Sequence, residues 1–459
     1  MPPAPAHAFT RAFTSTSALS RARRRVAVVL VSALLLLGGA VATGSATGPA
    51  AADSPTADSP AAAGRGGAWV GTWATVPTAT PASATPVLHD ETVRQVVRTS
   101  IGGDRLRLRL TNEFGDTPLR VGEVRVARRD GGSGTDIDPA TDRAVTFNGQ
   151  TSVTVPAGAP LLSDPVDLRV PPRADLVVSV YLPEETPVTT LHAFSYQENV
   201  VASGNATGAA SVEATATMTQ WHLLSGVSVR TRTPGAGAVV ALGDSITDGA
   251  ETRVNANNRW PDLLAERLRH TGVLNLGVAG NRLLHDPNPP PGSDAEGYAA
   301  FFGQSALRRF DRDVLAQPGA EHVIVLLGVN DLGHPGTSAP ESEEVSAEEI
   351  IGAHRQIIAR AHAAGLRAHG GTILPFKGDT LGFHSAENEA KRQRVNDWIR
   401  TSGEYDTVID FDRVMRDPAD PLRLRPAYDS GDHLHPNDAG MAAMAAAVPT
   451  SLFRPDRAG

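Results

Sequence analysis

The second half of the chain alternates between short apolar runs and longer helical stretches, and no other feature limits its fold as strongly. The runs that are typical of strands are centred near Val239, Val273, Val323, Arg367 and Val408. The stretches with helical periodicity lie between them, at 261–269, 305–316, 346–364 and 385–400. Strands that alternate with helices form a parallel sheet, because each crossover helix returns the chain to the same end of the sheet. We therefore predict an α/β domain over residues 238–455.

The first of these strands ends in a turn made of Gly243, Asp244 and Ser245. Ligands of such sheets bind at the carboxyl ends of the strands, so Ser245 stands where a reactive group is expected. Gly243 and Gly249 let the following loop adopt backbone angles that other residues avoid, so the hydroxyl can be presented for nucleophilic attack. An isolated serine in such a turn would more often cap a helix or stabilise the turn.

Three further polar blocks follow in the sequence, at 275–281, 328–331 and 432–436. A serine hydroxyl is a weak nucleophile until a base accepts its proton, and a carboxylate holds that base in the right tautomer. His435 suits the role of the base, and Asp432 can reach its Nδ1 from three residues earlier on a tight loop. Asp244 is too close to the serine for this task and is interpreted as a hydrogen-bonding residue of the loop.

Taken together, the four blocks resemble those of the SGNH, or GDSL, hydrolases. The resemblance implies a flavodoxin-like parallel sheet and an oxyanion hole formed by the backbone N–H groups of Ser245 and Gly280 and the side-chain amide of Asn330. It also implies that Ser245, His435 and Asp432 hydrolyse carboxylic esters through an acyl-enzyme. Without this context Asn330 would be an ordinary turn residue, since asparagine is common in turns.

The pair His433 and His435 beside Asp432 also permits a different interpretation. Imidazole and carboxylate groups are common zinc ligands, so this block alone could hold a metal ion. The sequence has no second cluster of histidine and aspartate with comparable spacing, and it has no cysteine. We therefore expect neither a metal nor another cofactor.

Residues 1–42 have the pattern of a signal peptide. Five arginines and no acidic residue precede the apolar run 26–42, as in segments that direct export. Small residues offer alternative cleavage sites at 40–42, 44–46 and 50–52. We expect a secreted, extracellular protein, exported by the Sec or the twin-arginine route and without stable membrane insertion after cleavage. An uncleaved anchor is the alternative, because the run is near the lower length of a membrane span. Residues 43–67 are rich in Ala, Pro, Ser and Gly and are predicted to form a flexible linker.

Residues 68–233 show a different pattern, in which short runs alternate between apolar and polar side chains. In 105–110 the leucines fall on one face of a strand and the arginines on the other. Similar runs lie at 92–101, 119–127, 152–155, 166–170 and 175–182. Regular strands with turns such as Asn148-Gly149 predict an antiparallel sandwich or jelly roll. SGNH hydrolases with an N-terminal β-domain are similar, among them acyl- and arylesterases associated with xylan degradation.

The formal net charge of −8 becomes more negative once the five arginines of the signal peptide are removed. An acidic chain without basic clusters interleaved with aromatic residues is not expected to bind nucleic acid or other polyanions. We expect a serine esterase that acts on a small-molecule or polysaccharide ester. The proline-rich segment 286–302 is expected to border its active site and to favour acetyl to butyryl esters over long-chain lipids. The alternatives are an acyltransferase or a lysophospholipase or lipase of the same family, and a non-catalytic glycan-binding protein.

Overall fold

The computed structural model describes residues 67–132 and 134–453. The predicted signal peptide lies outside these residues, as does the predicted linker up to residue 66, and both stay predictions. Among the described residues, none of the helices has the length and apolar character needed to cross a membrane.

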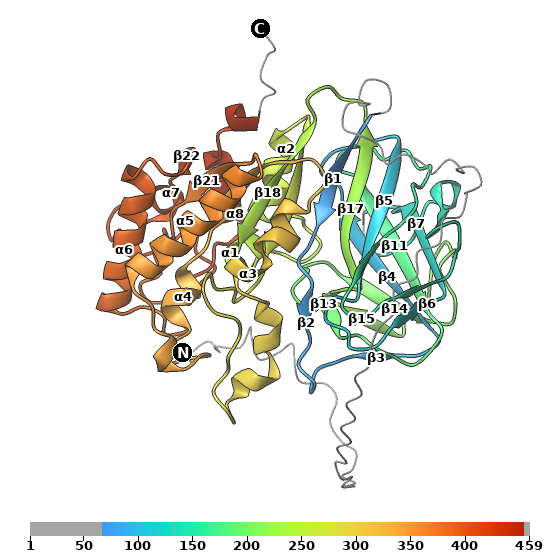
Figure 1. Ribbon diagram of the computed structural model, residues 1–459, viewed down its shortest axis with the longest axis horizontal. Helices are drawn as coiled ribbons and strands as arrows, with labels where there is room; N and C mark the ends of the chain where they lie inside the picture. Colours follow the sequence, from blue (N-terminus) through green and yellow to red (C-terminus); the bar gives the residue numbers. More distant parts are fainter. Residues whose placement is uncertain (1–66, 133, 454–459) are drawn as a thin grey trace, which may run out of the picture. The chain divides into compact units, whose positions relative to one another are not determined.

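A five-stranded sheet forms the centre of the second half of the chain, and all its neighbouring strands run parallel (Figure 1). The strands are β18 (Gly237–Gly243), β19 (Thr271–Gly277), β20 (Ala320–Leu326), β21 (Arg367–Gly371) and β22 (Thr407–Ile409). Their order across the sheet is β19-β18-β20-β21-β22. This order starts in the middle and reverses direction once, as in flavodoxin-like folds, and it confirms the predicted α/β class.

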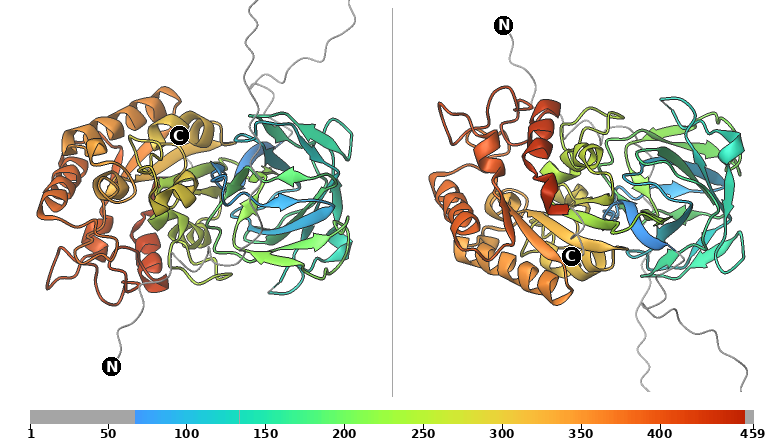
Figure 2. Two further views of the ribbon diagram at one scale, coloured as in Figure 1. Left: turned by 90° about the horizontal axis from the view of Figure 1, so that it is seen from below. Right: turned by 90° about the horizontal axis from the view of Figure 1, so that it is seen from above.

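Helices cover both faces of this sheet (Figure 2). They are α1 (Ser245–Asp248), α2 (Trp260–Arg267), α3 (Ala306–Phe310), α4 (Val329–Gly333), α5 (Ala347–Ala363), α6 (Ala386–Thr401), α7 (Phe411–Met415) and α8 (Asp438–Ala447). Successive side chains of a strand point to opposite faces, so β18 contributes to two cores. Val239 and Ala241 pack with residues of α2, α7 and α8, whereas Val240 and Leu242 pack with residues of α3, α5 and α6.

Local signals in the sequence explain where the longest of these helices begins and ends. The Ser346 side chain accepts a hydrogen bond from Glu349 N, and the Glu349 side chain accepts one from Ser346 N, which is a capping box. Gly365 follows the helix with a φ of +79°, which suits glycine. The helix predicted at 305–316 is divided instead, because α3 continues into a π-helical turn at Asp311–Leu315.

Residues 68–231 form antiparallel sheets. The larger sheets contain β1 (Ala68–Ala74), β4 (Glu91–Arg98), β5 (Arg105–Thr111), β7 (Glu123–Arg128), β8 (Arg143–Val145), β10 (Pro160–Leu162), β11 (Asp175–Leu182), β14 (Asn199–Ser203), β15 (Ala216–Met218) and β17 (Leu224–Thr231). The smaller sheets contain β2 (Thr78–Ala79), β3 (Val87–Leu88), β6 (Leu119–Val121), β9 (Val153–Val155), β12 (Thr186–Pro187), β13 (Thr190–His192) and β16 (Trp221–His222). The three leucines of β5 are fully buried, as the alternation predicts.

Two predicted strands of this region differ in the structure. The run 166–170 is not a strand, because Leu168 N donates to Val166 O and this local turn bends the backbone. The run 119–127 is interrupted at Gly122, and β6 and β7 pair in different sheets. The turn at Asn148 and Gly149 forms as predicted, since both residues have a positive φ.

The β-rich region packs against the edge of the parallel sheet formed by β19. Gly71 of β1 lies so close to this strand that a Cβ would come within 2.7 Å of Leu274 Cδ1. The Ser100 hydroxyl accepts a hydrogen bond from Val273 N at 2.9 Å. One cluster of buried apolar residues therefore runs from the β-rich region into the parallel sheet. The predicted domain ranges 68–233 and 238–455 stay predictions.

Candidate active site

Ser245 is the first residue of α1 and follows β18 at the carboxyl edge of the sheet. Asp244 caps this short helix, because its side chain accepts a hydrogen bond from Ile246 N at 3.0 Å. This is the loop role that the sequence predicts for Asp244. A Cβ on Gly243 would lie 2.1 Å from Thr247 Oγ1, so the turn requires glycine there. The turn thereby holds the serine hydroxyl at the edge of the sheet.

Ser245, His435 and Asp432 are joined by hydrogen bonds. His435 Nε2 lies 2.8 Å from Ser245 Oγ, and His435 Nδ1 lies 2.5 Å from Asp432 Oδ2. A carboxylate only accepts hydrogen bonds, so Nδ1 carries the proton and Nε2 is free to accept the proton of the serine hydroxyl. The side chain of His435 is buried, which keeps this geometry away from bulk water.

The loop before α8 holds Asp432 in place. Its Oδ1 accepts hydrogen bonds from the N–H groups of Leu434 and His435 and from the Ser430 hydroxyl. Burial alone would raise the pKa of Asp432, but the hydrogen bond and charge of His435 and the backbone N–H groups outweigh burial and lower this pKa well below its ordinary value. Asp432 is therefore a carboxylate at neutral pH. Asn437 caps α8, because its side chain accepts a hydrogen bond from Gly440 N, and the helix begins at Asp438.

The two other predicted residues lie after the strands that flank β18. Gly280 follows β19 and Asn330 lies in α4 after β20, so the strand order places Ser245 between them. The backbone N–H groups of Ser245 and Gly280 make no hydrogen bond to any other described residue. Asn330 Nδ2 donates one hydrogen bond to Asn281 O at 3.0 Å and keeps a second N–H for another acceptor. Three sets of donors are thus available at one edge of the sheet.

Gly280 has a structural reason to be glycine. Its φ is +75°, and a Cβ would lie 2.1 Å from the ring of Phe302. Phe302 belongs to the segment 286–302, which therefore borders the predicted oxyanion hole. A small cleft beside Gly280 is lined by residues of this segment and by His334. Burial lowers the pKa of His334 to about 3, so this imidazole is neutral at pH 7.

Sequence reasoning missed a buried pair that connects the β-rich region to α1. His192 of β13 places Nε2 2.9 Å from Asp248 Oδ1, and its Nδ1 lies 3.0 Å from Val76 O. The second oxygen of Asp248 accepts a hydrogen bond from Ala279 N at 3.0 Å, one residue before Gly280. Asp248 stands in the Gly-Asp-Ser block and could have been noticed there, whereas nothing in the sequence marks His192.

A buried arginine holds the ends of β18 and β19 together. Arg309 of α3 donates to Asn281 Oδ1 at 2.9 Å, to Leu276 O at 3.2 Å and to Gly243 O at 3.2 Å. Asn281 also donates to two backbone carbonyls, so its loop is fixed from both sides. The loop that carries Gly280 is therefore held by an arginine that no motif of the sequence indicates.

His433 has a different partner from His435. Its Nδ1 lies 2.5 Å from Asp429 Oδ2, and its φ of +62° lies in the left-handed region. Among the described residues, no group of three or more His, Cys, Asp or Glu side chains is arranged to hold a metal ion.

The comparisons with known proteins agree with this geometry. Residues 241–443 match the model of the GDSL-like lipase/acylhydrolase family, so this part of the chain is similar to the domains of that family. The match supports, in general terms, an ester-hydrolysing enzyme of the esterase or lipase type. No curated protein matches the chain.

Several solved structures are similar to part of the chain. A GDSL-like lipase from Bacteroides thetaiotaomicron is 18% identical and matches 47% of this chain and 87% of its own, with a TM-score of 0.34. The aryl esterase of M. smegmatis is 15% identical and matches 46% of this chain and 96% of its own, with a TM-score of 0.36. A member of the lipolytic protein G-D-S-L family from Veillonella parvula is 18% identical and matches 46% of this chain and 96% of its own, with a TM-score of 0.32. At these values the assignment rests on the family match alone.

Proposed function

We propose that the protein is a secreted serine esterase in which Ser245 is the nucleophile, His435 the general base and Asp432 the carboxylate that orients it. The observation that carries the proposal is the continuous chain of hydrogen bonds from Asp432 through His435 to Ser245, at 2.5 and 2.8 Å. Secretion rests on the sequence of residues 1–42 alone.

The proposed reaction follows from the positions of the protons. As Ser245 Oγ attacks the ester carbonyl, its proton moves to His435 Nε2, and the carboxylate of Asp432 stabilises the imidazolium. His435 then gives this proton to the leaving alcohol, and an ester of Ser245 remains. A water molecule activated by the same histidine releases the acid. This scheme needs only the side chains that the hydrogen bonds already connect.

The N–H groups of Ser245, Gly280 and Asn330 donate hydrogen bonds to the negatively charged oxygen of each tetrahedral intermediate. The first two have no other partner among the described residues, and Asn330 keeps one N–H free. Preorganised donors of this kind are worth about 3 to 4 kcal/mol each in the transition state. Their rigid attachment to three neighbouring strand ends supports this role.

The substrate proposed is a short-chain ester, which includes O-acetyl groups of polysaccharides. The cleft beside Gly280 is bordered by Phe302, whose ring lies 5.0 Å from that of His334. Phe301 stands edge-on to Phe194 of the β-rich region at 6.5 Å, so aromatic side chains fill the neighbouring space. We infer from this crowded aromatic wall that short acyl groups are preferred to long chains.

Substitution of the nucleophile tests the proposal. Hydrolysis of p-nitrophenyl acetate by Ser245→Ala should fall to below roughly a tenth of wild type, and by far more if the triad acts as a unit. Circular dichroism should be unchanged. His433→Ala is the matched control, because this neighbouring histidine bonds to Asp429 instead of the serine. Ser245→Ala with normal turnover and normal fold would remove Ser245 from the mechanism.

The preferred acyl-chain length of the substrate is tested on the same enzyme. We expect kcat/KM to fall from acetyl and butyryl to palmitoyl p-nitrophenyl esters, and acetate to be released from acetylxylan. A preference for the palmitoyl ester would contradict the short-chain proposal while leaving the nucleophile intact.

A further inference from the structure

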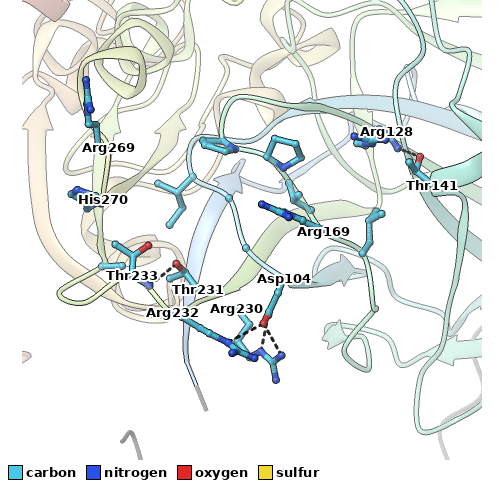
Figure 3. A pocket seen from close by; sticks show the side chains of 18 of the residues that line it. Asp104, Arg128, Thr141, Arg169, Arg230, Thr231, Arg232, Thr233, Arg269 and His270 are labelled. Carbon is cyan, nitrogen blue, oxygen red and sulfur yellow. Dashed lines mark hydrogen bonds and ion pairs between the residues drawn. The ribbon is translucent and has the colours of Figure 1, made fainter. Parts of the chain in front are cut away.

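A second cleft, of about 1050 Å³, lies where the β-rich region meets the start of the parallel sheet (Figure 3). Its wall on the β-rich side includes the loop 101–104 and the segment 168–172. Residues 230–233, at the end of β17 and just after it, also line the cleft, as do residues 269–270, just before β19. Segments that are far apart in the sequence therefore form this cleft together.

The lining of this cleft is strongly basic. It contains six arginines and a single acidic residue, Asp104. The arginines are Arg128, Arg143, Arg169, Arg230, Arg232 and Arg269. The whole chain has 50 acidic residues and only 42 lysines and arginines, so the cleft is opposite in sign to the molecule that carries it. Such a local concentration of one charge creates a positive potential that attracts anions.

Several of these guanidinium groups have no carboxylate partner. In the part of the chain that the structure describes, the side chains of Arg169 and Arg269 make no hydrogen bond and no ion pair. Arg143 donates only to backbone carbonyl oxygens, among them Ala140 O at 3.1 Å and Asp142 O at 2.8 Å. These three arginines can therefore bind an added anion without giving up an existing ion pair.

Asp104 orders two more of the arginines. Arg230 donates to both of its oxygens, at 2.8 and 3.0 Å, and Arg232 Nε lies 3.3 Å from Asp104 Oδ2. Figure 3 shows Arg230 and Arg232 converging on Asp104, with Arg269 and His270 on a separate segment. Asp104 carries one negative charge and the two arginines carry two positive charges, so the group keeps a net positive charge. The shared carboxylate also holds both guanidinium groups in place.

This cleft is distinct from the site around Ser245. Residues 230–233 and 269–270 precede β18 and β19, whereas Ser245 and Gly280 follow these strands. The two strands are parallel and seven residues long, which corresponds to roughly 20 Å at about 3.3 Å per residue. The basic cleft lies at the amino end of the sheet and the proposed active site at its carboxyl end.

The net charge of the chain gave no reason to expect a polyanionic ligand, but the arginines gathered in this cleft do. We propose that the cleft binds a segment of an anionic polysaccharide through its carboxylate groups. Guanidinium groups recognise carboxylates by two parallel hydrogen bonds, which makes arginine better suited to them than lysine. The lining contains no Phe, Tyr or Trp, so it offers no surface on which nucleic-acid bases could stack. Its volume of about 1050 Å³ is slightly above the range of about 300 to 1,000 Å³ for small-molecule sites, which suits a ligand of several sugar units.

The choice of a glycan, rather than another polycarboxylate, rests on the proposed function, whereas the basic cleft itself does not. A site that holds an acidic stretch of a polysaccharide would keep the polymer on the enzyme while Ser245 acts on an ester elsewhere along it. The net negative charge of the rest of the molecule would repel the polymer outside the cleft and limit the contact to a short segment.

Binding is measured without turnover. The Ser245→Ala protein is titrated calorimetrically with an oligogalacturonate, with a neutral xylo-oligosaccharide of the same length, with polyglutamate and with polyphosphate. R169E/R269E, made in the same background, reverses the charge of the two arginines without partners, both of which are exposed. Circular dichroism checks that this variant folds. R120E is the matched control, because Arg120 is exposed on β6 and does not line the cleft.

We expect the oligogalacturonate to bind, the neutral sugar not to bind, and R169E/R269E to weaken binding by about tenfold or more, with R120E unchanged. Added salt should weaken binding in step, because exposed charges are screened. Equal affinity for polyglutamate or polyphosphate would contradict the claim that the ligand is a glycan. An equal loss of affinity in R120E would contradict the claim that the cleft is the binding site. Absence of oligogalacturonate binding would overturn the whole inference. Because Ser245 is already replaced, none of these results depends on whether the protein proves to be an esterase.

Discussion

Two carboxylates beside the proposed nucleophile are shifted in opposite directions. Burial raises the pKa of Asp244 to about 7. Although burial would also raise the pKa of Asp432, hydrogen bonds and the charge of His435 lower it below its ordinary value. Pairs of acids whose pKa values are shifted apart in this way are typical of sites in which only one of the two groups must be charged. Here Asp432 supplies the charge, and Asp244 contributes a helix cap.

The raised pKa of Asp244 predicts a pH dependence of stability. Between the ordinary value near 4 and the folded value of about 7 the folded state binds more protons, so the free energy of unfolding falls as pH rises through this window. The slope is at most about 1.4 kcal/mol per pH unit for one proton. Asp244→Asn keeps an acceptor for Ile246 N and removes this loss. In urea titrations from pH 4 to 8, wild type should lose stability relative to the variant, and parallel curves would contradict the assignment.

Asn330 is expected to act on the transition state. Asn330→Ala should lower kcat on the order of 10²-fold with a smaller change in KM, because the free N–H of its amide serves the developing oxyanion. Steady-state kinetics with p-nitrophenyl acetate measures both parameters. A raised KM with unchanged kcat would instead make Asn330 a substrate-binding residue.

At the scale of elements, the small strand β13 supports α1 and the loop after β19. His192 and Asp248 are both buried, and the Asp248 carboxylate also holds Ala279 N next to Gly280. Loss of the imidazole leaves that carboxylate without its partner and lets the loop shift. A displacement of this kind is costly, since about 1 Å of misplacement can lower a rate by 10²-fold.

We therefore expect His192→Ala to lower kcat roughly 10-fold to 100-fold with a smaller effect on KM. His192→Gln should recover part of the loss, because its amide can donate to Asp248. His222→Ala is the control, since this buried histidine of the paired strand β16 bonds to Gln220 and not to α1. Equal loss in both alanine variants, without rescue by glutamine, would show a merely structural effect.

At the scale of the whole molecule, the β-rich region and the parallel sheet share one cluster of buried apolar residues. Val70 of β1 belongs to it together with Leu274 of β19 and Val240 of β18. Elements that share a core are expected to unfold together, because neither part can lose its partner without exposing apolar surface.

Calorimetry should accordingly show a single unfolding transition with equal calorimetric and van't Hoff enthalpies. Gly71→Val should lower the midpoint of that one transition, since even a Cβ would come within 2.7 Å of Leu274. Two separate transitions in wild type would contradict the shared core.

The sequence by itself determined the features that depend on local pattern. Strand and helix periodicity was enough to predict the parallel sheet and the antiparallel region. The resemblance of the polar blocks to those of SGNH hydrolases led to the prediction of Ser245, Gly280 and Asn330 as site residues. His435 and Asp432 were recognisable because they are three positions apart on one loop. The run 166–170 was predicted wrongly because a local hydrogen bond bends a backbone whose side chains still alternate.

Only the tertiary structure decided which distant residues support these predicted site residues. The partners His192 and Asp248 are 56 residues apart, and Arg309 and Asn281 are 28 apart, so no spacing rule of a helix or strand connects them. The basic cleft arises in the same way, from arginines that are scattered along an acidic chain. Burial, pKa shifts and local potential depend on distances through space, and folding alone sets these distances.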